Sequence, residues 1–283
     1  MIASNVALTV DVEDAHHGLD VQGRSSTLDN DVNWILDEFR KHELHGTFFV
    51  LGELLDSHAN LIKKIASDGH EVGFHGARHR FLRDEGPVKF ASGLRSSIPR
   101  LEDLTGSRVY GFRAPFFSIV PETAWCLDIL ASQSFEYDAS IYPGRNDRYG
   151  WPGAPVSPVR YGTTGLVLFP VPLLHPKLPV GFSGGAYLRL LPHRFVEWGL
   201  RRAARLGQPG MVYVHPWEIA ARLRWRNDAR LRANLTRHLL RQRMRPQLTR
   251  LLASGEAKFG TMRSVIENLP SLPIWNPADN HPG

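Results

Sequence analysis

Short apolar runs alternate with longer amphipathic stretches along most of the chain. The β-branched run from Val6 to Val10 predicts a buried strand, and residues 29–42 carry apolar side chains at helical spacing. The same alternation predicts strands at 47–51, 71–75, 109–112, 166–171 and 211–214, and helices at 58–68, 89–105, 121–133 and 192–206. Repeated strand and helix units of this kind predict an α/β fold with a mostly parallel sheet.

Three stretches interrupt this alternation. Residues 143–165 are rich in glycine, proline and aromatic side chains, and they predict a long loop over the site. Residues 228–253 predict an arginine-rich helix, residues 258–262 a closing segment, and the prolines from Pro270 onward an extended tail. No repeat or linker divides the chain. We therefore expect a single domain over 1–283, with a catalytic core at about 1–218 and an arginine-rich helical C-terminal extension at about 219–283.

The composition is that of a folded, soluble protein. Of the 283 residues, 42% are hydrophobic and 22% are charged, and no apolar run is long enough to cross a bilayer. The chain begins with a strand, without a basic region and cleavage site, so a cytoplasmic location is expected. Cys126 is the only cysteine, which excludes a cysteine-based zinc cluster. A metal in this protein must therefore be held by histidine and carboxylate.

The formal net charge is +6, and arginine is concentrated in the C-terminal third. Such a region forms either a solvated helix face or a surface that contacts an anionic substrate or a membrane. No nucleic-acid-binding module accompanies the arginines, so nucleic acid is not an expected partner. The pattern specifies no oligomeric state.

Polar residues follow several of the predicted strands. Asp11, Glu13 and Asp14 come after the first strand, His75 and His79 after the third, and His215 after the strand at 211–214. The carboxyl ends of parallel strands are where α/β folds place their chemistry. His75 and His79 stand four residues apart, so a helical turn would bring both imidazoles to one ion. Two histidines and one carboxylate leave a position open for water, which is typical of catalytic zinc.

Two carboxylates compete for the place of third ligand. In an extended strand Glu13 shares a face with Asp11, whereas Asp14 needs a turn to point inward. The sequence leaves both open.

Five segments in order resemble the NodB-type polysaccharide deacetylases of carbohydrate esterase family 4. The segments are residues 6–14, 46–52, 69–79, 111–116 and 214–217. The resemblance implies a distorted (β/α) barrel of about seven strands. It also implies a divalent metal held by His75, His79 and either Glu13 or Asp14, with zinc expected and cobalt or another divalent ion as alternatives.

The resemblance also assigns catalytic roles. It implies that Asp11 is the general base, that Arg113 pairs with it, and that His215 is the general acid. Asp138 is expected near His215, where its charge would keep the imidazole protonated. The backbone N–H of Phe116 is expected to stabilise the oxyanion.

Substrate contacts are expected at Pro115, Phe116, Tyr187 and Trp217, although packing is an equal explanation for Tyr187 and Trp217. Residues 135–266 further resemble deacetylases found with bacterial exopolysaccharide and exosortase gene clusters. The implied reaction is removal of acetyl from an N-acetylated sugar in an exopolysaccharide, an O-antigen, or a lipid-linked or nucleotide-linked precursor. The alternatives are a small-molecule amide or ureide hydrolase and a non-catalytic glycan-binding domain.

Overall fold

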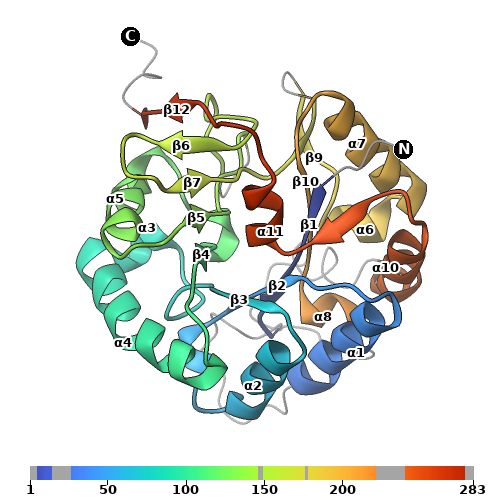
Figure 1. Ribbon diagram of the computed structural model, residues 1–283, viewed down its shortest axis with the longest axis horizontal. Helices are drawn as coiled ribbons and strands as arrows, with labels where there is room; N and C mark the ends of the chain where they lie inside the picture. Colours follow the sequence, from blue (N-terminus) through green and yellow to red (C-terminus); the bar gives the residue numbers. More distant parts are fainter. Residues whose placement is uncertain (1–4, 15–26, 146–148, 176–177, 221–239, 278–283) are drawn as a thin grey trace.

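Strand β1 (Asn5–Val12) is the strand around which the sheet is built. It pairs in parallel with β10 (Gly210–Val214) on one side and with β2 (Thr47–Val50) on the other. The computed structural model describes residues 5–14, 27–145, 149–175, 178–220 and 240–277. Figure 1 shows the strands near the centre and the helices around them.

Seven strands in the described part of the chain run parallel in the order β10-β1-β2-β3-β4-β5-β7, and antiparallel β6 and edge strand β12 follow. The remaining strands are β3 (Glu71–Phe74), β4 (Gly111–Phe112), β5 (Tyr137–Asp138), β6 (Val159–Tyr161), β7 (Val167–Leu168), β8 (Leu173–His175), β9 (Leu178–Gly181), β11 (Lys258–Gly260) and β12 (Ile274–Trp275). The predicted α/β barrel of about seven strands is confirmed.

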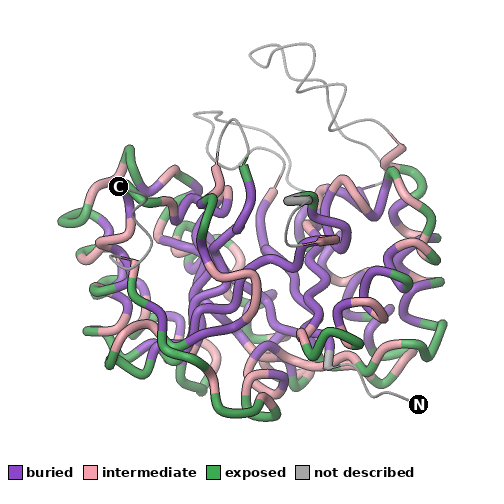
Figure 2. The backbone as a smooth tube through the Cα atoms, turned by 90° about the horizontal axis from the view of Figure 1, so that it is seen from above, coloured by how far each residue is buried: buried purple, intermediate pink, exposed green. Residues whose placement is uncertain are grey.

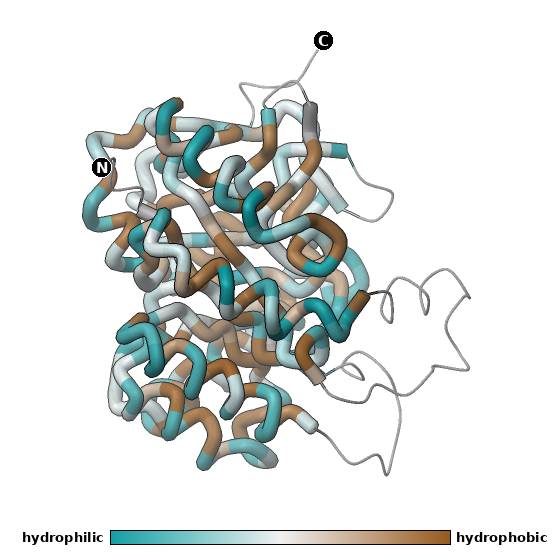
Figure 3. Tube along the Cα trace, turned by 90° about the vertical axis from the view of Figure 1, so that its right-hand side faces the viewer, coloured by the Kyte–Doolittle hydropathy of each residue, from teal (hydrophilic) through white to brown (hydrophobic). Residues whose placement is uncertain are grey.

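Most of the helices pack on the outside of this sheet, and α11 (Met262–Glu267) lies at one end of the barrel. The other helices are α1 (Leu28–Lys41), α2 (Ala59–Ser67), α3 (Leu82–Glu85), α4 (Pro87–Thr105), α5 (Trp125–Ser132), α6 (Ala186–Leu190), α7 (His193–Arg205), α8 (Pro216–Ile219) and α10 (Met244–Ala253), with short 3₁₀ turns at Gly52–Leu54, Pro115–Phe117, Pro121–Thr123 and Arg241–Arg243. Hydrophilic and hydrophobic residues alternate along the outer helices (Figure 3). Their apolar faces and the sheet form a buried centre, and exposed residues lie toward the outside (Figure 2).

The barrel has an outer core and an inner core. Successive side chains of β1 point alternately into one and the other. Leu8 and Val10 pack outward against the helices, whereas Ala7 packs inward with Met211 and Tyr213 of β10. Because alternate residues share a face, Asp11 points inward as Ala7 does. The inner core is therefore the floor beneath the site.

Helix α11 closes the amino end of the barrel. It lies over the centre of the ring of strands in Figure 1, and Met262 and Val265 join the inner core. The Met262 backbone N–H donates to the Thr47 hydroxyl at the start of β2, at 2.8 Å. The opposite, carboxyl end of the barrel carries the polar residues identified above.

Several boundaries differ from the predicted ones. The predicted loop at 143–165 contains β6, and the predicted strand at 166–171 shrinks to β7. The hairpin of β8 and β9 was not predicted, because its strands are short and contain Pro179. The predicted helix at 121–133 is a 3₁₀ turn followed by α5.

The C-terminal region returns to the sheet rather than remaining a helical extension. β11 pairs in parallel with the first residues of β1, and β12 pairs with β6. Helix α10 forms the end of the predicted arginine-rich helix, whose residues up to 239 lie outside the described part. None of the described helices combines the length and apolar composition needed to cross a bilayer.

Several arginines of the C-terminal third make contacts within the protein. Arg245 donates to the Ile219 carbonyl at 2.9 Å, Arg241 donates to the Ala220 carbonyl, and both acceptors lie at the end of α8. Arg201 pairs with Glu256 at 2.8 Å. These arginines tie α7, α8 and α10 together, and the arginines from 222 to 237 lie outside the described residues.

Candidate metal and catalytic centre

The carboxyl end of β1 delivers Asp11 and Glu13 to the same place. The Glu13 backbone N–H donates to the Asp11 carbonyl at 2.9 Å, which makes a tight three-residue turn centred on Val12. This turn ends the strand. Both carboxylates are almost fully buried, with 2% of Asp11 and 7% of Glu13 exposed.

Glu13, His75 and His79 form a group that could hold a metal ion. One ligand atom from each lies within 4.8 Å of the others, and all three residues are buried. Glu13 Oε2 contacts His79 Nε2 and lies 3.9 Å from His75 Nε2. Asp14 lies outside this group. It lies toward α1, where burial raises the pKa of Asp31 and the charge of Asp14 raises it further.

The expected helical turn between the two histidines is wrong, because the segment after β3 is an irregular loop with bends at residues 77–79. Gly76 has a φ of +94°, a conformation that a helix cannot contain. The loop is fixed to the chain that follows β2, since the Gly52 N–H donates to the Gly76 carbonyl and the Glu53 N–H to the Ala77 carbonyl, both at 2.9 Å. The two imidazole rings nevertheless lie 5.7 Å apart.

His75 is oriented by its second ring nitrogen. Nδ1 lies 2.8 Å from the Arg113 carbonyl oxygen, which can only accept, so Nδ1 carries the proton and Nε2 faces Glu13. Burial lowers the pKa of His75 to about 4. The imidazole is therefore neutral near pH 7, as metal binding requires.

Arg113 is fully buried beneath the site. It donates to Asp11 Oδ1 at 2.6 Å and to the Thr9 hydroxyl at 2.9 Å, and its Nε donates to the Ala139 carbonyl at 3.2 Å. The guanidinium lies 4.2 Å from the centre of the Phe49 ring. These contacts hold the Asp11 carboxylate in one orientation.

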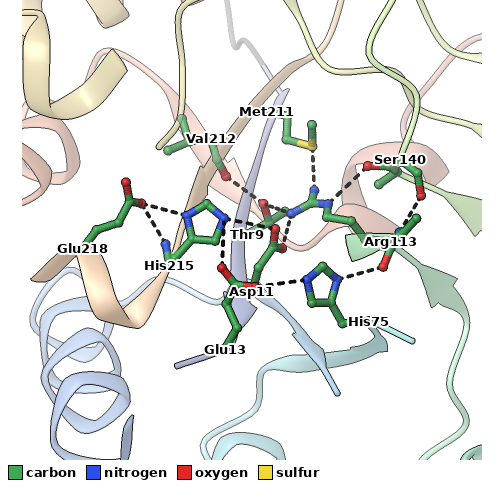
Figure 4. Close-up of polar contacts among 12 residues, drawn as sticks. Thr9, Asp11, Glu13, His75, Arg113, Ser140, Met211, Val212, His215 and Glu218 are labelled. Atoms are coloured by element: carbon green, nitrogen blue, oxygen red, sulfur yellow. Dashed lines mark hydrogen bonds and ion pairs between the residues drawn. The ribbon is translucent and has the colours of Figure 1, made fainter. Parts of the chain in front are cut away.

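His215 follows β10 and completes the site from the other side. Its Nε2 lies 3.7 Å from Asp11 Oδ2 and 3.8 Å from Glu13 Oε1 (Figure 4). Its Nδ1 lies 2.9 Å from Glu218 Oε2, which also accepts the His215 backbone N–H at 3.0 Å. This reciprocal arrangement is a capping box at the start of α8, with Pro216 in the first turn.

The expectation that Asp138 accompanies His215 is wrong, because Glu218 occupies that position. Asp138 is fully buried and accepts hydrogen bonds from the backbone N–H of Ser140, at 3.1 Å, and from its hydroxyl. Burial raises the pKa of Asp138 to about 7 despite these bonds. Glu218 is also fully buried, and its other oxygen lies 3.1 Å from Arg189 Nε.

The carboxylates around His215 favour its charged form. Burial alone would lower the pKa of this imidazole, but Glu218, Glu13 and Asp11 together raise it to about 9. His215 is therefore protonated near neutral pH and able to donate a proton.

Phe116 forms one wall beside the histidines. It has a φ of +59°, a conformation that is rare outside glycine and recurs at functional sites. Its ring lies 4.2 Å from the His79 ring and stacks on Phe81, also at 4.2 Å. Pro115 before it is buried. Contact of the Phe116 N–H with substrate stays a prediction.

Trp217 supports the centre directly. Its Nε1 donates to Glu13 Oε1 at 2.9 Å, and its indole stacks on the His215 imidazole with ring centres 5.4 Å apart. Tyr187, on α6, is partly buried. Substrate contact by these two residues also stays a prediction.

Four residues of the site were not predicted from the sequence: Thr9, Ser140, Met211 and Glu218. Glu218 alone had a usable signal. It stands three residues after a histidine at a strand end, with proline between them, which is the spacing of a helix N-terminus.

The family described as Polysaccharide deacetylase matches residues 3–132, which contain Asp11, Arg113 and the three candidate ligands. Residues 3–132 therefore carry a polysaccharide deacetylase domain. Residues 139–267 match a second family, described as Domain of unknown function (DUF3473). His215 and Glu218 of the centre therefore come from the second match.

Curated relatives match part of this chain. A peptidoglycan deacetylase of Helicobacter pylori is 30% identical over 112 residues, which are 38% of this chain and 36% of that protein. A peptidoglycan-N-acetylglucosamine deacetylase of Bacillus cereus is 30% identical over 86 residues, or 30% of this chain and 31% of that protein. The chain thus spans about a third of the length of these relatives.

Solved structures share the deacetylase fold over nearly the whole chain. A Mycobacterium smegmatis protein assigned to the polysaccharide deacetylases has a TM-score of 0.63 at 21% identity, covering 96% of this chain and 94% of its own. PuuE allantoinase has a TM-score of 0.62 at 14% identity, covering 93% and 89%. A carbohydrate esterase family 4 pseudoenzyme of Bacillus anthracis has a TM-score of 0.51 at 16% identity, covering 97% and 69%. The fold alone therefore leaves the activity open.

Proposed function

We propose that this chain is a metal-dependent N-deacetylase that removes the acetyl group from an N-acetylated sugar in a bacterial glycan. One observation carries the proposal. The candidate ligand group of Glu13, His75 and His79 adjoins both Asp11 and His215, so that a base, an acid and a metal site meet in one buried centre. The match of residues 3–132 to the polysaccharide deacetylase family supports the same activity.

The residues fit a divalent metal. Glu13 Oε2 is buried without a hydrogen-bond partner among the described residues, and it contacts His79 Nε2. A cation between Glu13 Oε2 and His79 Nε2 would resolve this contact. Two imidazoles and one carboxylate are the donor set of catalytic zinc sites, with cobalt as an alternative. The bound ion would polarise the acetamide carbonyl and leave a position open for water.

The protein's own groups would move the protons. Asp11, held by Arg113, accepts a proton from the attacking water as the C–O bond forms at the acetamide carbon. His215 Nε2 then donates a proton to the sugar nitrogen as the C–N bond breaks, so that acetate and a free amine leave. Glu218 holds the Nδ1 side of His215 and keeps Nε2 directed at the reacting atoms.

The substrate class separates this proposal from the alternatives. We expect acetate release from oligomers of N-acetylglucosamine and none from peptides carrying acetyl-lysine. Allantoin serves as the small-molecule comparison, because PuuE allantoinase shares the fold. Hydrolysis of allantoin without acetate release from any sugar would replace the proposal with a small-molecule hydrolase. Sugar binding without hydrolysis would replace it with a glycan-binding domain.

A further inference from the structure

The half of the chain that matches a domain of unknown function contributes an aromatic surface beside the acid. Five of the seven tyrosines lie in this half, and four of them gather on the side of the barrel where Tyr213 contacts His215. We call these four the tyrosine wall: Tyr142, Tyr149, Tyr187 and Tyr213. They come from four different segments, namely the chain after β5, the chain before β6, α6 and β10. The fold therefore brings them together from distant positions in the sequence.

Ring contacts connect the wall with both sides of the catalytic centre. Tyr213 lies 5.1 Å from Phe117 and 6.0 Å from the His215 imidazole, measured between ring centres. Tyr149 lies 5.4 Å from Tyr142 and 6.2 Å from Phe117. Because Phe117 follows the Phe116 wall of the metal site, the tyrosines extend the same surface from the metal side to the acid side.

The wall has a buried base and a more accessible rim. Tyr142 and Tyr213 are 6% and 8% exposed and belong to the inner core of the barrel. Tyr149 and Tyr187 are partly exposed, so their side chains reach the surface of the protein. The rim residues are the ones that a bound molecule could touch.

The hydroxyl groups of the wall are held in place. The Tyr142 hydroxyl accepts the Gly181 N–H at 3.3 Å, and it also bonds the Tyr187 hydroxyl. Tyr213 packs flat on Gly184, where a Cβ atom would lie 2.3 Å from its ring. The absence of a side chain at Gly184 is therefore required for Tyr213 to occupy this position.

We propose that the tyrosine wall is the subsite that recognises the sugar ring of the substrate, with Tyr149 and Tyr187 making the direct contacts. A hexosamine ring presents apolar C–H faces and several hydroxyl groups. A tyrosine offers an apolar ring and one hydroxyl, and sites built from such groups combine apolar contact with a few fixed hydrogen bonds. The inference rests on the proposed function and assigns to the second half of the chain both the acid and the recognition of sugar.

The test compares Tyr149→Phe, Tyr187→Phe and the double variant on two substrates. One is the tetramer of N-acetylglucosamine, and the other is 4-nitrophenyl acetate, which carries the acetyl group but no sugar. A lost hydrogen bond to a neutral hydroxyl costs about 2- to 10-fold, so the double variant should lose roughly 4- to 100-fold in kcat/KM on the tetramer. The loss should appear as a higher KM for the tetramer. The double variant should hydrolyse the ester as fast as the native protein does.

Tyr110→Phe is the matched control. This tyrosine is also partly buried, but it precedes β4 at the amino end of the barrel, where Arg263 covers its ring at 3.7 Å. The Tyr110→Phe substitution should leave hydrolysis of both substrates unchanged. The inference is overturned if the double variant loses kcat/KM equally on the tetramer and the ester, or loses it on neither substrate.

Calorimetry separates this inference from the proposed function. In the Asp11→Asn background, which removes the base, the tetramer should bind, and adding the two tyrosine changes should weaken binding about 4-fold or more. If the native protein releases no acetate but the tetramer binds and depends on the two tyrosines, the proposed reaction fails and the sugar subsite stands. If the tetramer does not bind, or binds equally without the two hydroxyls, the subsite is overturned.

Discussion

Asp11→Asn is expected to lower turnover about 100- to 10,000-fold, because a positioned general base contributes that much to a hydrolysis. The amide has nearly the same shape as the carboxylate and can still accept the hydrogen bond from Arg113, but it cannot take a proton from water. The loss should appear in kcat on an N-acetylglucosamine oligomer. Circular dichroism and zinc binding should report a folded protein with its metal site retained.

Glu71→Gln is the control for changing a buried carboxylate to an amide. Glu71 accepts hydrogen bonds from Thr47 and Tyr137 at the amino end of the barrel, and burial raises its pKa. This substitution should alter thermal stability at most and leave turnover near the native value. If Asp11→Asn kept more than about a tenth of native turnover, Asp11 would not be the base.

His215→Ala should lower turnover by a similar factor, about 100- to 10,000-fold, because the leaving amine needs a proton. The dependence of rate on pH identifies the role more specifically. His215 must be protonated to act, and the surrounding carboxylates outweigh burial and raise its pKa to about 9. The rate of the native protein should therefore fall only as pH rises through that range.

Glu218→Gln should move this alkaline limb to lower pH. The substitution removes the largest of the charges that raise the pKa of His215, so the imidazole loses its proton earlier as pH rises. The glutamine oxygen can still accept the His215 N–H, so turnover on the acidic side should fall less than in His215→Ala. An alkaline limb that stays in place in Glu218→Gln would show that another group sets it.

The sequence predicted the architecture of the centre well because each functional segment follows a strand. Asp11 and His215 directly follow β-branched runs, and the parallel pairing of β1 with β10 brings those two strand ends together. The hydrophobic pattern reports strand position and alternation reliably. It carries no information on loop conformation, which is why the segment from His75 to His79 was assigned a helical turn.

The choice between Glu13 and Asp14 depended on one backbone turn. The bond from the Glu13 N–H to the Asp11 carbonyl keeps Glu13 on the side of the histidines and leaves Asp14 toward α1. A turn of three residues has no distinctive sequence signal when carboxylates occupy every candidate position. The prediction of the carboxylate that partners His215 failed for a different reason. Asp138 ends β5, Glu218 lies in the helix α8 that follows β10, and packing decides which of the two carboxylates reaches the imidazole.

The site also explains why the two family matches belong together. The first half supplies Asp11, Arg113 and the candidate ligands, and the second supplies His215, Glu218 and the tyrosine wall. Trp217 of the second half contacts the first half, because its indole N–H donates to Glu13. Neither half alone contains both an acid and a base for the proposed reaction.

Zinc titration of metal-stripped protein, followed by acetate release from the N-acetylglucosamine tetramer, tests the central claim most directly. We predict that activity is absent without metal and saturates at about one zinc per chain, since one open site needs three protein ligands. Glu13→Ala should lose this response, while Asp14→Ala, which removes the neighbouring carboxylate, should keep it. Full activity in protein that elemental analysis finds free of metal, or equal losses in the two variants, would contradict the account.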